Sequence, residues 1–108
     1  MTVRTAQLAA GTATAGGNTT VYTCATGRTV ILKDIRFWAA FGAIPRVALY
    51  LSSGAGQVSI VDRALANVEA YGAAAWCVLE PGDQLWVFSQ TNNVRYWFSG
   101  TELDGVAP

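Results

Sequence analysis

The residue types that most often carry out catalysis or bind metal ions are few in this chain. The sequence contains no histidine, which excludes the common Ser-His-Asp and Cys-His catalytic arrangements and histidine-based metal sites. We therefore expect no catalytic residue, no cofactor and no bound metal ion. The carboxylates, none of them in a calcium-binding pattern, are Asp34, Asp62, Glu69, Glu80, Asp83, Glu102 and Asp104.

One pair of carboxylates, Glu80 and Asp83, flanks a Pro-Gly dipeptide. Two carboxylates can perform glycoside hydrolysis, but acidic residues beside a turn are usually hydrated turn residues, and we favour that interpretation. The glycine-rich segments lack the lysine and the strand-to-helix setting of a phosphate-binding loop. The sequence therefore predicts a protein that is not an enzyme.

The two cysteines, Cys24 and Cys77, are far apart in the chain and do not form a Cys-x-x-Cys motif. Free cysteine packs as a small hydrophobic residue, so we predict two buried free thiols. A disulfide between them, which would suit an oxidising compartment, is the alternative.

Aromatic residues are the strongest remaining signal. Flat rings can stack on sugar faces, so an exposed cluster would bind a host surface glycan. Trp and Tyr are also common anchors of protein interfaces, and large rings fill hydrophobic cores. The tryptophans and tyrosines are Trp38, Trp76, Trp86, Trp97, Tyr22, Tyr50, Tyr71 and Tyr96.

Length and charge predict one small domain, residues 1–108, that assembles with other subunits. Charged residues are 13% of the chain, hydrophobic residues are 52%, and the formal net charge is zero. A lone domain usually presents more charge to water, and exposed apolar surface usually marks an interface. Zero net charge gives no general attraction to nucleic acid or to an anionic membrane.

We expect synthesis in a cytoplasm, because the first residues lack a signal peptide's apolar segment and no apolar run approaches the roughly 18 to 20 residues of a membrane span.

The elements that must position these residues are centred on residues 74–88. Residues 77–79 and 85–88 are rich in strand-forming side chains. Between them, Pro81 and Gly82 suit the two central positions of a type II turn. This pattern predicts a β-hairpin that buries at least one face.

The rest of the chain predicts further strands and no long helix. About eight strands at spacings near ten residues are typical of an antiparallel β-sandwich of the jelly-roll type. Residues 11–18 are predicted as a loop, 62–68 as a helical turn or irregular chain, and 104–108 as a tail. Gly100 is predicted to bend the chain. The remaining strand segments are 2–9, 19–24, 29–40, 46–53, 58–61 and 94–99, with 101–103 as a continuation.

Residues 29–40 are the longest strand-like segment, and apolar side chains occur on both of its alternating faces. A β-bulge near Lys33 or Asp34 would re-aim the side chains, and a strand covered on both sides is the alternative. The two apolar sets are Ile31, Ile35 and Phe37 on one parity and Val30, Leu32 and Trp38 on the other.

The strands near residues 85–88 and 94–99 also carry large apolar residues on both parities. A two-layer sandwich buries only one face of each sheet, so we expect the surplus face to contact another subunit. A register error of one residue would exchange this interface set with the core set. The candidate interface residues, which share the non-core parity of their strands, are Trp38, Tyr50, Trp86, Phe88 and Trp97.

Four segments of the chain form an ordered pattern: Thr19-Thr20-Val21-Tyr22-Thr23, residues 27–35, Val47-Ala48-Leu49-Tyr50-Leu51 and Val78-Leu79-Glu80-Pro81-Gly82-Asp83-Gln84-Leu85. In this order they resemble small β-sandwich virion proteins of tailed bacteriophages. Those proteins typically pass through a TTVYTVPAG strand and turn, a KSI strand, a VTLYLV strand and a VLEPGD hairpin. The resemblance spans residues 18–104, and it departs from the family where Cys24-Ala25-Thr26-Gly27 replaces a Val-Pro-Ala-Gly type of turn.

The resemblance implies a non-catalytic virion part that is usually multimeric and supplies no catalytic residue. We expect a structural subunit of a phage virion, assembled in the host cytoplasm as a homo-oligomer, with a trimer favoured. Tail association ranks before capsid (head) decoration, and a glycan-binding module for host recognition is the further alternative. The expected partners are copies of itself and other virion proteins, with a host surface glycan as a further candidate and with no nucleic acid or membrane partner.

Overall fold

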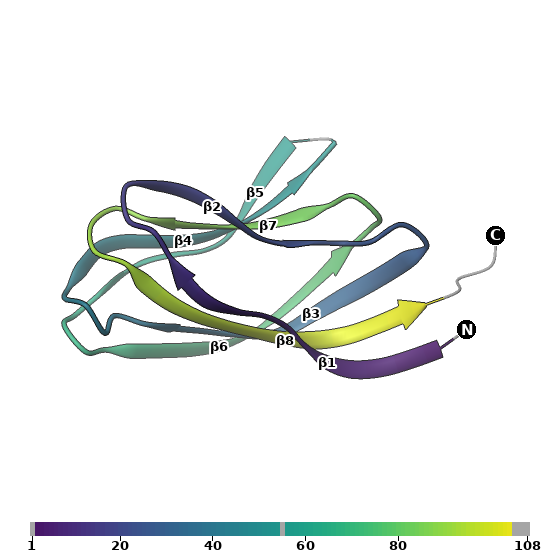
Figure 1. The fold of residues 1–108 in the computed structure, drawn as a ribbon, viewed down its shortest axis with the longest axis horizontal. Coiled ribbons are helices and arrows are strands. Elements are labelled where there is room, and N and C mark those ends of the chain that lie inside the picture. Colours follow the sequence, from purple (N-terminus) through teal and green to yellow (C-terminus); the bar gives the residue numbers. More distant parts are fainter. Residues whose placement is uncertain (1, 55, 105–108) are drawn as a thin grey trace.

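The computed structural model describes residues 2–54 and 56–104, which form eight β-strands in two four-stranded sheets. Sheet A has the strand order β1-β8-β3-β6, and sheet B has the order β2-β7-β4-β5. The two sheets lie one above the other as a sandwich (Figure 1). The strands are β1 (Thr2–Ala13), β2 (Gly17–Thr23), β3 (Arg28–Trp38), β4 (Ile44–Ser53), β5 (Gly56–Leu65), β6 (Ala70–Leu79), β7 (Gln84–Ser89) and β8 (Val94–Asp104).

The connections between strands define the topology. Every connection crosses from one sheet to the other except that between β4 and β5, which are paired neighbours in sheet B. This is the eight-stranded jelly-roll arrangement, so the predicted all-β, jelly-roll-like sandwich is confirmed. No helix within residues 2–54 and 56–104 is long and apolar enough to cross a membrane.

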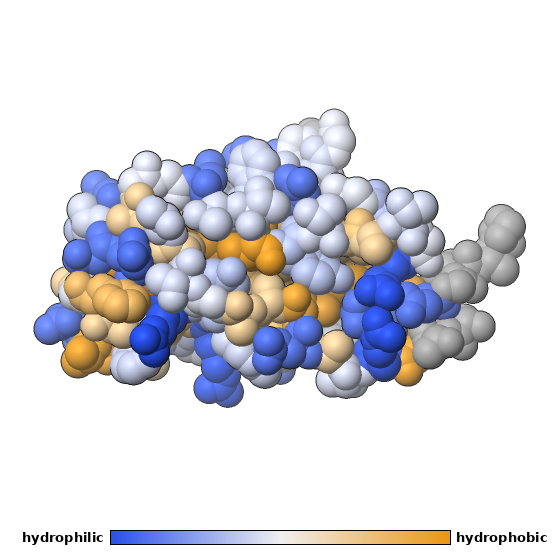
Figure 2. Space-filling model, in the orientation of Figure 1, coloured by the Kyte–Doolittle hydropathy of each residue, from blue (hydrophilic) through white to orange (hydrophobic). Residues whose placement is uncertain are grey.

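The core lies between the two sheets and is built from their inward-facing side chains. Phe37 of β3 and Phe98 of β8 pack edge to face, with ring centroids 5.6 Å apart. Figure 2 shows hydrophobic residues near the middle of the molecule, between the two sheets, and further ones at its lower edge. Each large apolar side chain buried in this way contributes roughly 1.5 to 3 kcal/mol. The largest fully buried side chains are Val30, Leu32, Ile35, Phe37, Ile44, Val47, Leu49, Leu65, Leu79, Leu85, Val87 and Phe98.

A register shift in β3 explains why its apolar residues occupy both parities. The pairing of β3 with β6 and with β8 shifts between Leu32 and Asp34, which confirms the predicted bulge. Val30 and Leu32 are buried before the shift, and Ile35 and Phe37 are buried after it. The tryptophan that ends β3 therefore points away from the core.

The hairpin predicted over residues 74–88 is wrong, although its turn is correctly predicted. β6 belongs to sheet A and β7 to sheet B, so these two strands are not paired. The Asp83 amide donates to the Glu80 carbonyl at 3.0 Å, and Gly82 has the positive φ of 91° that a type II turn requires. The turn pairs with Cys24, whose amide donates to the Asp83 carbonyl at 2.9 Å. A Pro-Gly turn reverses the chain without determining whether both strands enter one sheet.

Two segments are more extended than the sequence predicted. The loop predicted at 11–18 is shorter, because β1 continues to Ala13 and β2 begins at Gly17. Residues 62–65, predicted as a helical turn or irregular chain, instead continue β5. They become a strand because β4 supplies their hydrogen-bond partners, and pairing with a distant strand is not encoded in a short local pattern.

β8 continues through Gly100 to Asp104, so residues 101–103 continue the strand as predicted. A Cβ at Gly100 would overlap the Ile31 carbonyl oxygen of β3, so glycine permits close approach of two backbones. Of the predicted tail, Asp104 belongs to β8, and residues 105–108 lie outside the described residues.

Candidate functional site

The five candidate interface residues all point away from the core, but they lie on two opposite surfaces. Trp38 and Trp97 are on the outer face of sheet A and are 42% and 37% exposed. Tyr50, Trp86 and Phe88 are on the outer face of sheet B and are half-buried. Because the two outer faces point in opposite directions, one flat partner surface cannot contact all five. The two faces therefore have to be considered as separate candidate sites.

On the outer face of sheet B, one arginine binds several side chains of the same face. The Arg46 guanidinium lies over the Phe88 ring, 5.2 Å from its centroid, and donates to the Tyr50 hydroxyl at 2.9 Å. Its Nε donates to both carboxylate oxygens of Asp62, at 3.1 and 3.0 Å. These hydrogen bonds lower the pKa of the Asp62 carboxyl and raise the pKa of Arg46. The charges at this part of sheet B are therefore paired within the chain.

On the outer face of sheet A, two arginines and two tryptophans alternate in a two-by-two arrangement, here called the Arg–Trp array. In the pairing of β3 with β8, Arg36 is opposite Trp97 and Trp38 is opposite Arg95. Cβ atoms of directly opposite residues on antiparallel strands are about 4.5 to 5.5 Å apart. Each arginine of the array therefore has a tryptophan as its cross-strand neighbour.

A surface groove of about 450 Å³ runs beside the array. It exists because the edge strand β6 has small residues here: Gly72 is opposite Arg36, and Ala70 is opposite Trp38. No large side chain of β6 fills the outer face at these two positions. The other lining residues, in addition to the array, are Phe37, Tyr71 and Tyr96.

Contacts with neighbouring side chains orient part of the array. The Arg95 guanidinium lies over the rings of Trp38 and Phe41, 5.2 and 5.4 Å from their centroids. The Trp97 indole N–H donates to Gln7 Oε1 at 3.0 Å. These contacts restrict two side chains of the array before any ligand arrives.

Arg36 and Arg95 have no carboxylate partner among residues 2–54 and 56–104. A guanidinium carries five N–H donors that match a carboxylate or phosphate in bidentate geometry. The array therefore presents two cationic groups with donors available to an anion. The arginines that do form ion pairs are Arg4, Arg28, Arg46 and Arg63.

The other half of the same face carries an apolar patch, composed of Val3, Ile31, Trp76, Val78 and Leu103. Trp76 is 76% exposed, Val3 is 58% exposed and Val78 is 51% exposed. Val3 is opposite Leu103, and Ile31 is opposite Val78. The two pairs share one face because Leu103 is opposite Thr29, two positions from Ile31 on β3. Exposed apolar side chains gathered on one face of a protein often mark an interaction site.

Sequence reasoning did not include Trp76 among the candidate interface residues, although it is the most exposed of the four tryptophans. The signal was present, because β6 alternates between exposed and covered positions and Leu79 is buried. Trp76 lies an odd number of positions from Leu79, so it faces outward. The interpretation of residues 77–79 as a continuous apolar run concealed this alternation.

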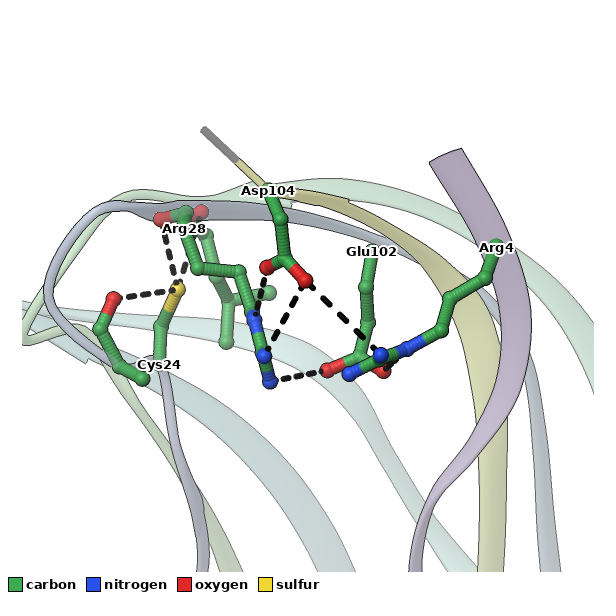
Figure 3. Close-up of polar contacts among 7 residues, drawn as sticks. Arg4, Cys24, Arg28, Glu102 and Asp104 are labelled. Atoms are coloured by element: carbon green, nitrogen blue, oxygen red, sulfur yellow. Dashed lines mark hydrogen bonds and ion pairs between the residues drawn. The ribbon is translucent and has the colours of Figure 1, made fainter. Parts of the chain in front are cut away.

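Four charged side chains form a cluster where β1 begins and β8 ends (Figures 1 and 3). Arg28 of β3 binds Asp104 through Nε at 2.5 Å and Glu102 through Nη1 at 2.6 Å. Arg4 of β1 binds Glu102 at 2.9 Å. The hydrogen bond from Arg28 holds the pKa of the Asp104 carboxyl below its usual value. Two positive and two negative charges balance here, so the cluster links three strand ends and leaves no free charge for a ligand.

Both cysteines are free thiols, as the sequence predicted. The predicted burial is confirmed for Cys24, whereas Cys77 is only partly buried. The Cys24 thiol donates to the Arg28 carbonyl at 3.2 Å. Burial raises the pKa of both thiols, which disfavours the reactive thiolate. Within the described residues, no three His, Cys, Asp or Glu side chains are grouped so that they could hold a metal ion.

Comparisons with known proteins identify the fold without a family. No protein family model matches the sequence, and no curated protein matches it. Among solved structures, the core of Drosophila NLP, whose structure concerns pentamer formation and histone binding, is similar with a TM-score of 0.55. The two chains are 12% identical, and the match covers 94% of this chain and 98% of that chain. This similarity shows a shared fold.

Two further solved structures have lower scores. Infectious bursal disease virus, Gx strain, gives a TM-score of 0.46 and 16% identity over 99% of this chain and 33% of the viral chain. Eiger TNF from S. frugiperda gives 0.39 and 18% identity over 82% of this chain and 64% of that chain. The present chain thus spans about a third of the length of the viral chain.

Proposed function

We propose that this protein is a non-catalytic structural subunit that assembles with copies of itself through the apolar patch of sheet A. The observation that carries the proposal is Trp76, which is 76% exposed beside Val78 on the same face. Removing apolar surface from water contributes about 25 cal/mol per Å², so a partner that covers this ring and its neighbours gains substantial free energy.

The edge strand β6 supports assembly at the same place. It occupies the outer position in sheet A, and Ala70–Leu79 contains no charged residue and no proline. Charged side chains and prolines are the usual devices that keep an edge strand from pairing with another chain. A formal net charge of zero also weakens the repulsion between copies. The edge and the adjoining patch together form one surface that a second copy can cover.

We further propose that the subunit is a tail-associated part of a tailed-bacteriophage virion, assembled as a homotrimer in the host cytoplasm together with other virion proteins. The support is the ordered resemblance of four segments to small β-sandwich virion proteins. These segments fall on β2, β3, β4 and the connection from β6 to β7. The Drosophila NLP core is described in terms of pentamer formation, so three copies must be distinguished from five by a measured mass.

Sedimentation velocity of the wild type and of Trp76→Arg tests the assembly surface. The wild type should sediment as one oligomer, and Trp76→Arg should sediment near the 11.4 kDa protomer mass. The reason is that an unpaired charge is costly to desolvate at the centre of an apolar contact.

Val58→Arg is the matched control for this experiment, because Val58 is 61% exposed on β5, in the other sheet. This variant should keep the wild-type oligomer. An oligomer that survives Trp76→Arg, or that dissociates only in Val58→Arg, would overturn the proposed surface.

A further inference from the structure

We infer that the groove beside the Arg–Trp array binds a carboxylate-bearing saccharide, such as a uronic or sialic acid residue of a cell-surface polysaccharide. The groove lies on the half of sheet A that the apolar patch does not occupy. The inference therefore goes beyond the proposed assembly and does not depend on it.

The negative charge of the ligand follows from the two arginines of the array. Within the described chain, Arg36 and Arg95 lack an ion-pair partner, whereas each of the other arginines has one within 3.2 Å. Asp34 lies two residues before Arg36 and is exposed, yet it forms no ion pair with either arginine. An incoming carboxylate can accept from a guanidinium in the planar, bidentate geometry that arginine favours.

The ring-shaped part of the ligand follows from the two tryptophans. Trp38 and Trp97 are 42% and 37% exposed, so part of each indole is available to stack on the C–H face of a sugar. The hydrogen bond to Gln7 already orients Trp97, and the Trp38 ring already positions Arg95. Side chains that are oriented in advance lose less conformational freedom on binding.

Size and charge distribution favour a saccharide over single-stranded nucleic acid. A volume of about 450 Å³ lies within the range of small-molecule sites. Single-stranded nucleic acid requires a positively charged track along several nucleotides. Lys33, the remaining cation on this face, lies over Trp76 on the other side of the register shift, 5.4 Å from its ring centroid. Two neighbouring guanidiniums beside a short groove suit one acidic sugar and its neighbour.

Titration of ¹⁵N-labelled protein with 3′-sialyllactose and with lactose tests the inference through the indole N–H signals of the four tryptophans. We expect the Trp38 and Trp97 signals to shift with sialyllactose and not with lactose, while the Trp76 and Trp86 signals stay in place. Trigalacturonate and its methyl ester form a second pair of acidic and neutral probes. No indole shift with either acidic probe at about 10 mM, a weak-binding limit, would overturn the inference.

Matched variants locate the binding to the array. Arg36→Gln and Arg95→Gln should each weaken binding by about tenfold to a hundredfold, the value of a charge-assisted hydrogen bond. Lys33→Gln removes the same charge from the other half of the face and should leave binding unchanged.

The remaining outcomes separate this inference from its competitors. Equal shifts with lactose and with sialyllactose would mean that the groove binds neutral sugars. They would overturn the inference that the ligand must carry a carboxylate. Shifts with single-stranded oligouridylate but with no saccharide would overturn it in favour of nucleic acid. A Trp76→Arg variant that binds sialyllactose like the wild type would support the groove independently of assembly, whether that variant sediments as a monomer or as the wild-type oligomer.

Discussion

The two outer faces of this jelly roll carry similar aromatic residues, but their arginines differ in whether they have a carboxylate partner. On sheet B, Arg46 binds the Asp62 carboxylate and the Tyr50 hydroxyl. On sheet A, Arg36 and Arg95 have no carboxylate partner within the described residues. The number of outward-facing aromatics therefore does not distinguish the faces. The ion pairing of the arginines does distinguish the faces. It indicates that sheet A is the face whose arginines are available to bind an anion.

Sheet A is also divided within itself. The register shift that runs through β1, β3 and β8 separates the apolar patch from the Arg–Trp array. Sheet B also has register shifts, in the pairing of β2 with β7 and of β4 with β5, but its outer face shows no comparable division into apolar and cationic halves among the described residues. One sheet thus offers two surfaces of different chemistry to two different partners.

The largest effect is expected at Gly100, which lies next to the register shift in sheet A and pairs with Leu32 of β3. Gly100→Ala should lower the free energy of unfolding by about 3 kcal/mol, because the added Cβ would overlap the Ile31 carbonyl oxygen. Gly17→Ala on β2 of sheet B is the control, since no atom lies within 4 Å of the added Cβ. Urea denaturation measures both variants, and equal stabilities would contradict the special role of Gly100.

The next effect compares the ion pairs of the two sheets. Glu102→Gln in sheet A should lower the free energy of unfolding by about 2 kcal/mol, because the Glu102 side chain is 9% exposed and accepts from both Arg4 and Arg28. Asp62→Asn in sheet B should cost less, because its ion pair is exposed and screened by water. Chemical denaturation at neutral pH would contradict this order if Asp62→Asn were the more destabilised variant.

A smaller effect is expected from acid. The pKa of Asp104 is lowered by its hydrogen bond from Arg28, so the folded state favours the ionised carboxylate. The resulting stability is complete above the unfolded pKa of about 4 and is lost as the pH falls through the depressed folded pKa. Thermal melting followed from neutral pH downward should therefore show a shallower acid decline for Asp104→Asn than for the wild type. An identical decline in both proteins would contradict the proposed linkage.

The smallest effect compares the arginines directly. Arg46→Gln should lower the melting temperature, because it removes the hydrogen bonds to Asp62 and Tyr50. Arg95→Gln should change the free energy of unfolding by no more than about 0.5 kcal/mol, as expected for a surface side chain without an ion pair. Calorimetry measures the stability of both variants. If Arg95→Gln were the less stable protein, the result would contradict the conclusion that Arg46 is paired within the chain and Arg95 is not.

Much of the fold was predictable because a sandwich buries one face of each strand. Leu85 and Val87 alternate with outward neighbours, and this alternation predicted a strand correctly. Apolar residues occupy both parities around Lys33, and this conflict predicted the bulge correctly. The partners of β6 and β7 were not predictable, because the Pro81-Gly82 turn suits a hairpin and a crossing between sheets equally well.

The candidate site was only half predictable, for a related reason. Strand parity gave the outward direction of Trp38 and Trp97, because parity is a local property. Their arginine neighbours follow from the pairing of β3 with β8, two strands that are far apart in the sequence. Which outward residues share a sheet, and whether an arginine there has a carboxylate partner, depend on that pairing.

Light scattering of the wild-type protein across a wide concentration range tests the central proposal most directly. If the apolar patch of sheet A is an assembly surface, the mass should be a constant multiple of 11.4 kDa, with three copies as the proposed stoichiometry. A mass of one protomer at every concentration would contradict self-assembly through this face.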